Sequence, residues 1–146
     1  MLNNLESNQN KAPACQAPDP LLKKPALRVS RGATDCHAHI CGPDTIYPFS
    51  PQRIYTPPDA LLPQYQSLLK NLGIDRAVLV QPSIYGDDNR ALLNALAMDP
   101  SHLRGVAVVN ANIADDYLEE LHLAGVRGVR CNIVDLADAK GILPIE

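Results

Sequence analysis

Three apolar runs separated by helical patterns constrain the fold of this chain more than any other feature. The runs are RAVLVQPS at residues 76–83, GVAVVNA at residues 105–111 and VRGVRCNIV at residues 126–134. Continuous apolar strands of this kind are typical of parallel sheets whose two faces are both covered. Residues 33–40 form a shorter run bounded by glycines, and this run predicts a further strand at the start of the sheet.

Helical patterns lie between the expected strands, with apolar residues at spacings of three and four. Each pattern begins at an aspartate that can serve as an N-cap and ends at glycine or proline. The predicted spans are Asp59 to Leu72 before Gly73, Asp87 or Asp88 to Met98 before Asp99-Pro100, and Asp115-Asp116 to Leu123 before Gly125.

The strand–helix–strand units have the length of right-handed parallel crossovers. Their repetition predicts an α/β protein, either a doubly wound sheet or a (β/α) barrel. The first strand is followed by HAHICGPD and by a proline-rich loop at residues 43–58, and neither contains the glycine pattern of a dinucleotide fold or of a P-loop. A loop of this length inside a domain is commonly functional.

Length, charge and composition narrow the location and the partners. The chain has 146 residues and a net charge of −3, which indicates one domain and, without a basic stripe, no nucleic-acid partner. No apolar run of about 18 residues predicts a membrane span, and the N-terminus lacks the apolar core of a signal peptide, so a cytoplasmic location is expected. Residues 1–31 hold four scattered prolines and predict an irregular arm before a domain at residues 32–146. The pattern sets no oligomeric state.

The cysteines form no C-x-x-C pair. In a reducing compartment we expect them to be free thiols packed as small apolar groups, and the alternative is a zinc site that uses Cys36 and Cys41. The four cysteines are Cys15, Cys36, Cys41 and Cys131.

Two histidines mark the end of the first expected strand. His37 and His39 are two positions apart and therefore project from one face of a strand, and Asp35 shares that face by the same alternation. The carboxyl ends of barrel strands are where active sites form. Two imidazoles there can hold a divalent metal ion or polarise an oxygen. The alternative is a pair of polar residues at the start of a loop, and the H-x-H pattern alone does not decide.

Polar residues also follow the later strands. Ser83 and Tyr85 either cap the next helix or line the loop. Arg130 and Asn132 share a face, and an arginine at a strand end suits a carboxylate of a substrate. The alternative for Arg130 is a structural pair with Asp35. Three cationic or titratable residues lie away from this edge and are expected to have structural or surface roles: His102, His122 and Arg127.

Four segments in order resemble the amidohydrolase-2 family of metal-dependent hydrolases: DCHAHICGP, YPFSPQRIYTPPDA, VLVQPSIYGDDN and GVRGVRCNIV. Within the family, the likeness is strongest to lactonases of the 2-pyrone-4,6-dicarboxylate hydrolase type. It extends from residue 33 to about residue 146. It implies a TIM-like (β/α)8 barrel of the metal-dependent hydrolase type, of which this chain holds the N-terminal half with about four βα units.

The resemblance also implies roles for individual residues. His37 and His39 match the family's first-strand histidine pair, which is catalytic. Tyr55, Ser83 and Arg130 match positions that contact the substrate carboxylate or line the pocket, and Tyr85 and Asn132 adjoin them. Two alternatives follow for the cofactor. Either His37 and His39 bind one divalent metal ion, zinc or manganese, or the site works without a metal and the imidazoles polarise the carbonyl.

Departures from the lactonase pattern bear on the substrate. This chain has Tyr85 where the lactonase has a histidine, and Leu136 where it has a second arginine. The expected substrate is therefore a different lactone or cyclic ester of a small carboxylate-bearing acid.

A complete barrel takes about 250 residues. The family's later-strand histidine and the aspartate that acts as general base have no candidate here, so the chain is expected to be a fragment that is inactive alone. The predicted function is lactone hydrolysis. The alternatives are a metal-dependent decarboxylase, a lactone isomerase, or a truncated non-catalytic remnant.

Overall fold

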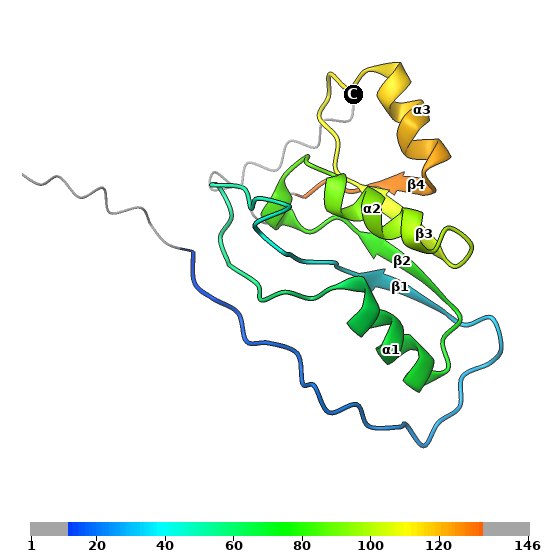
Figure 1. Ribbon diagram of the computed structural model, residues 1–146. Helices are drawn as coiled ribbons and strands as arrows, with labels where there is room; N and C mark the ends of the chain where they lie inside the picture. The colour runs from blue at the N-terminus through cyan, green and yellow to red at the C-terminus, as the bar shows by residue number, and fades with distance from the viewer. Residues whose placement is uncertain (1–11, 133–146) are drawn as a thin grey trace, which may run out of the picture.

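The computed structural model describes residues 12–132, in which four parallel strands alternate with three α-helices (Figure 1). The strands are β1 (Thr34–Ala38), β2 (Arg76–Val80), β3 (Leu103–Ala107) and β4 (Val126–Val129). The helices are α1 (Leu62–Leu72), α2 (Arg90–Met98) and α3 (Asp115–Leu123), and a short 3-10 helix, η1 (Ser83–Tyr85), follows β2. The predicted order of elements is confirmed.

The sheet order is β1-β2-β3-β4, so each strand pairs with the next one along the chain. A doubly wound sheet reverses its direction and places helices on both faces, whereas a barrel adds strands in one direction with its helices outside. Here one core cluster joins all three helices to the sheet, and this favours the barrel. Its buried members include Leu62, Leu69, Leu92, Ala95, Leu96 and Leu121 from the helices and Ala77, Leu79, Leu103, Ala107 and Val126 from the strands.

The first helix begins later than predicted, and its N-cap is Leu61 without a side-chain cap. The N-cap role expected of Asp59 is wrong because the chain is still extended there: the next residue, Ala60, pairs with Cys41 in an antiparallel bridge. The predicted stop is confirmed, since Gly73 adopts the left-handed conformation (φ 76°) and its N–H bonds to the last turn.

The second helix begins at Arg90, and neither aspartate before it is the N-cap. Asp88 instead accepts the backbone N–H of Arg90 and pairs with its guanidinium at 2.6 Å. The third strand ends at Ala107 rather than near residue 111, because the side chain of Asn89 takes both backbone groups of Val108.

The fourth strand ends at Val129, so Arg130 to Asn132 follow it. The remaining predicted strand residues, 133 and 134, lie outside the described residues.

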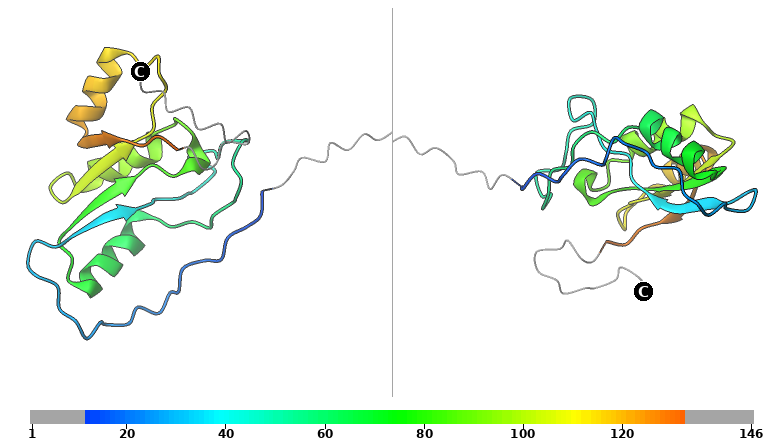
Figure 2. Two further views of the ribbon diagram at one scale, coloured as in Figure 1. Left: turned by 180° about the vertical axis from the view of Figure 1, so that it is seen from behind. Right: turned by 90° about the horizontal axis from the view of Figure 1, so that it is seen from below.

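The N-terminal arm is described from residue 12 onward, and Figure 2 shows it running along the outside of the sheet and past α1 before it enters β1. Thr56 in the proline-rich loop bonds to it three times, through Pro13, Cys15 and Ala12. The side chain of Asn71 in α1 donates to the carbonyl of Lys23 at 2.9 Å. The described part of the arm is thus attached at both ends of the sheet.

The expectation of packed thiols is correct for Cys41 alone. Cys15, Cys36 and Cys131 are exposed, because each lies in the arm, at the irregular part of β1 or after β4, where no helix covers it.

Between residues 12 and 132, no helix is both long enough and apolar enough to cross a membrane.

Candidate active site

The imidazoles of His37 and His39 lie side by side at the carboxyl end of β1. Their ring centroids are 5.0 Å apart and the rings meet edge to face. Ala38, between them, packs against the main core. Figure 1 shows the loop after β1 and η1 at the same end of the sheet, so this end carries the polar residues expected from the sequence.

Asp35 does not share the face of the histidines, and that prediction is wrong. A bulge lies between Asp35 and Ala38, so Asp35 lies opposite the core residue Ala77. Its carboxylate accepts a hydrogen bond from the O–H of Tyr65 in α1 at 2.9 Å. The alternation of a regular strand cannot reveal a bulge, which shifts every side chain before it by one position.

His39 is oriented by the neighbouring strand. Its Nδ1 lies 2.7 Å from the carbonyl oxygen of Val80, and because a carbonyl only accepts, Nδ1 carries the hydrogen. Nε2 therefore presents a lone pair. Burial lowers the pKa of His39, the Val80 bond opposes this, and the charges of His37 and Arg130 lower the pKa further. His39 is thus a neutral imidazole at physiological pH.

Arg130 lies beside this imidazole, directly after β4. Its backbone N–H bonds to Ala107 at 2.8 Å, and its guanidinium donates to the carbonyl of Gln81 at 3.0 Å and to the Asn132 side chain at 3.4 Å. The alternative pairing with Asp35 is not formed, since that carboxylate faces α1. Arg130, Asn132 and the histidines are therefore gathered at one end of the sheet.

Tyr85 lies under the loop that follows β1. It is 4% exposed, and its hydroxyl accepts the N–H of Gly42 at 2.7 Å. Its ring packs on Phe49, and burial raises its pKa to about 12. Tyr55 is half-buried against a second, smaller cluster that Tyr85 forms with Cys41, Ile84 and Ala91, and Ser83 is half-exposed at the start of η1. Tyr85 and Tyr55 thus contribute to the wall under the loop.

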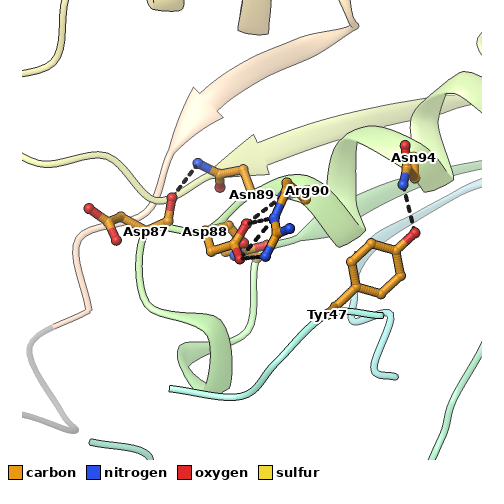
Figure 3. A network of polar contacts seen from close by, with 7 residues as sticks. Tyr47, Asp87, Asp88, Asn89, Arg90 and Asn94 are labelled. Atoms are coloured by element: carbon orange, nitrogen blue, oxygen red, sulfur yellow. Dashed lines mark hydrogen bonds and ion pairs between the residues drawn. The ribbon is translucent and has the colours of Figure 1, made fainter. Parts of the chain in front are cut away.

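The loop itself is tied to α2 (Figure 3). Asn94 of α2 donates to the hydroxyl of Tyr47 at 2.6 Å, and Ser50 bonds through its N–H to the carbonyl of Ile84. In the same view Asp88 pairs with Arg90 at the start of the helix, which lowers the pKa of Asp88. These contacts give the long loop a defined path beside the site.

Gln81 and Gly42 also shape the site, although the sequence assigned neither of them a role. Gln81 is fully buried, its side chain donates to the carbonyl of Asp88, and its own carbonyl holds Arg130. The signal for Gln81 was a polar residue at the end of an apolar run. Gly42 adopts a positive φ of 83°, and its Cα lies so close to Asp59 that a Cβ would not fit. A single glycine in the sequence does not reveal this close approach.

The residues present offer an incomplete metal centre. His39 has the tautomer of a metal ligand, with the second nitrogen donating to a backbone carbonyl. Catalytic zinc sites use three protein ligands. Within the described part of the chain no group of three or more histidine, cysteine or acidic side chains is placed to hold an ion.

A one-directional parallel sheet with its helices on one side, and with polar residues gathered at the carboxyl ends of its strands, is the arrangement of part of a (β/α) barrel. Residues 34–139 match the model of the amidohydrolase family. The chain belongs to the amidohydrolase-2 family, and its four strands form part of that barrel.

Individual relatives are lactone hydrolases. The chain is 46% identical over 111 residues to 2-pyrone-4,6-dicarboxylate hydrolase of Comamonas testosteroni, which covers 76% of this chain and 36% of the relative. It is 35% identical over 126 residues to 4-sulfomuconolactone hydrolase of Rhizobium radiobacter, covering 86% and 42%.

A solved structure is also similar. It is a probable 2-pyrone-4,6-dicarboxylic acid hydrolase from Acinetobacter baumannii with citric acid bound, with a TM-score of 0.66 and 34% identity over 69% of this chain and 38% of that one. This chain therefore spans about two fifths of the length of these relatives.

Proposed function

We propose that this chain carries the carboxylate-binding part of a lactone hydrolase site, for a lactone or related cyclic ester of a small organic acid. The placement of Arg130 is the observation that supports it most directly. Its charge acts on His39, and its hydrogen bonds go to a carbonyl and an amide rather than to an acid among the described residues. A guanidinium held in this way can bind a carboxylate through two parallel hydrogen bonds.

The tautomer of His39 assigns it an accepting role. With Nδ1–H committed to Val80, Nε2 can accept a hydrogen bond from the attacking water, but the neutral ring cannot donate to the ester oxygen. The donor to that oxygen is then His37, whose ring lies next to His39, or Arg130. Asp35 does not act as the base, because both of its oxygens are bonded on the side of α1 and the backbone.

The roles given to His37, His39 and Arg130 do not include a metal ion, and the turnover assay tests whether one is needed. A zinc or manganese ion would use Nε2 of His39 and a nitrogen of His37 and would act as a Lewis acid toward the carbonyl. The two imidazoles supply fewer ligands than such a site needs, so no step is assigned to the ion.

Citrate binding tests the carboxylate site directly. Titration calorimetry on the wild-type chain is compared with Arg130→Gln and with Arg127→Gln. Arg127 is a matched control, since it lies in β4, is exposed and donates to backbone carbonyls near the strand's start. A charge-assisted hydrogen bond contributes about 1.5–3 kcal/mol, so Arg130→Gln is expected to weaken binding by about 10- to 150-fold. Equal affinities of the two variants would overturn the proposal.

Turnover is the second test, and it uses a chain extended past Glu146, because residues 1–146 alone are expected to be inactive. A panel of carboxylate-bearing lactones is assayed with and without zinc or manganese, beside a His37→Ala/His39→Ala double variant. Hydrolysis that is lost in the double variant supports the hydrolase, and dependence on an added ion makes the imidazoles its ligands. Hydrolysis that persists at the wild-type rate in the double variant contradicts the assignment.

A further inference from the structure

The strand that carries the two histidines is irregular at one place. Asp35 lies opposite Ala77 and Ala38 lies opposite Leu79, so the two residues between Asp35 and Ala38 face a single residue of β2. A bulge of this kind inserts one residue, breaks the alternation of side chains and leaves the extra residue without its ladder partner.

The bulge decides which side chains face the helices. Asp35 and Ala38 both lie opposite core residues, although they are three positions apart. Alternation resumes after the bulge, so His37 and His39 project together, away from the core that Ala38 contacts. In a regular strand the carboxylate of Asp35 would lie among the imidazoles instead.

The carboxylate of Asp35 accepts one hydrogen bond from the bulge and one from helix α1. One oxygen accepts the backbone N–H of His37 at 3.0 Å, and this is the kind of group that a bulge leaves without a strand partner. The other oxygen accepts the O–H of Tyr65 at 2.9 Å. The pair therefore connects the backbone of His37 to α1.

Tyr65 is itself held by the core. Its ring is half-buried and packs against the main cluster, and α1 contributes the buried Leu62 and Leu69 to the same cluster. Burial, and then the bond to Asp35, raise the pKa of Tyr65, so its hydroxyl remains a donor at any physiological pH. The carboxylate of Asp35 is thus held by a hydroxyl donor whose ring is packed on helix α1.

We propose that Asp35 and Tyr65 are positioning residues for the histidine pair. Together they hold the bulge that turns His37 to the side of His39, and they couple the placement of α1 to the candidate active site. Neither residue contacts the substrate. The inference deepens the proposed function, since it rests on the role given there to the two imidazoles.

Three variants separate the two bonds. Asp35→Ala removes both. Asp35→Asn keeps an acceptor for His37, and its amide can donate to the Tyr65 oxygen, so it is the conservative rescue. Tyr65→Phe removes only the hydroxyl and keeps the ring. Tyr117→Phe in α3 is the matched control, because Tyr117 also packs half-buried against the main cluster and has no part in the bulge.

The first readout is the imidazole nitrogen spectrum of His37 and His39 at about pH 8. It reports ring environment and tautomer, which a loss of global stability alone does not change. Asp35→Ala and Tyr65→Phe are expected to shift the His37 signals and to lower the population of the Nδ1–H tautomer of His39. Asp35→Asn and Tyr117→Phe are expected to leave both rings unchanged. Citrate affinity is the second readout, and a loss is expected for Asp35→Ala because the imidazoles beside Arg130 would change position.

The outcomes distinguish this inference from the proposed function. If the wild type does not bind citrate but the ring signals move as stated, the carboxylate site fails and the positioning role stands. If citrate binds and the ring signals of Tyr65→Phe equal those of Tyr117→Phe, the positioning role is wrong. Should Asp35→Ala not fold, the comparison of Tyr65→Phe with Tyr117→Phe decides alone.

Discussion

His39 donates through Nδ1 to the carbonyl oxygen of Val80 at 2.7 Å, which links the end of β1 to β2. The bond leaves Nε2 as the free nitrogen, whatever the site binds. The first prediction is therefore that the neutral ring of His39 is in the Nδ1–H form. Long-range proton–nitrogen correlation spectra distinguish the two nitrogens. Exposed His122 serves as the comparison, and an Nε2–H form of His39 would contradict the geometry.

The lowered pKa of His39 predicts how stability depends on pH. Burial, the largest cause, disfavours the charged ring in the folded chain, whereas the unfolded chain takes up the proton near the ordinary value of 6.5. Between that value and the lower folded one, the unfolded state binds more protons, so the free energy of unfolding falls as pH falls. The stability contributed by the neutral ring is complete above this window and is lost through it.

Urea unfolding at about pH 7.5 and about pH 5.5 measures this effect. The wild type is expected to lose stability on acidification, and His39→Asn, whose amide can still donate toward Val80, is expected to lose less. His122→Asn is the control, since His122 is exposed. An equal loss in His39→Asn and in the wild type would place the titrating group elsewhere.

The order of elements could be predicted because strands 76–80 and 103–107 carry apolar residues toward the helices, and the helices between them have clear apolar stripes. The residues at which the strands and helices begin and end could not be predicted. Asn89 takes the backbone groups of Val108, and Ala60 pairs with Cys41, and both contacts link residues far apart in the sequence. A local pattern contains no information about such partners.

For the site, the paired histidines and Arg130 were predictable because alternation and strand ends bring such residues to one edge. The face of the strand on which Asp35 lies was not predictable, since a bulge inserts one residue without any change of composition. One of the two partners of the Arg130 guanidinium was also missed, because it is a backbone carbonyl, that of Gln81. Contacts to backbone groups depend on register, which only the folded sheet defines.

The hydrogen bonds of the buried Asn89 side chain give a stability prediction. Asn89 is 1% exposed, and its side chain makes three hydrogen bonds, two to Val108 and one to the carbonyl of Asp87. Asn89→Ala leaves these backbone groups without partners, so a loss of about 2–3 kcal/mol in unfolding free energy is expected. Asn94→Ala, at an exposed site on the same helix, is expected to change it by about 0.5 kcal/mol or less. Similar losses of unfolding free energy in the two variants would show that the Asn89 hydrogen bonds do not stabilise the fold.

Gly42, directly after the histidine strand, gives the last prediction. It has φ 83°, and a Cβ there would overlap the carboxylate of Asp59 and come within 3.3 Å of its Cα. Gly73 has a similar φ of 76°, and the nearest atom to its Cβ would be a Val29 methyl at 3.8 Å. Gly73→Ala therefore measures the left-handed strain alone, about 1–2 kcal/mol, and Gly42→Ala is expected to cost more.

Double variants separate the two causes at Gly42. In an Asp59→Ala background the side-chain overlap is removed, so the excess cost of Gly42→Ala over Gly73→Ala in urea unfolding is expected to shrink, while the shared cost of the positive φ stays. If the excess is unchanged, the Asp59 side chain is not its source. The remaining contact is then the Asp59 backbone, and the strain lies in the path of the chain between the histidines and α1.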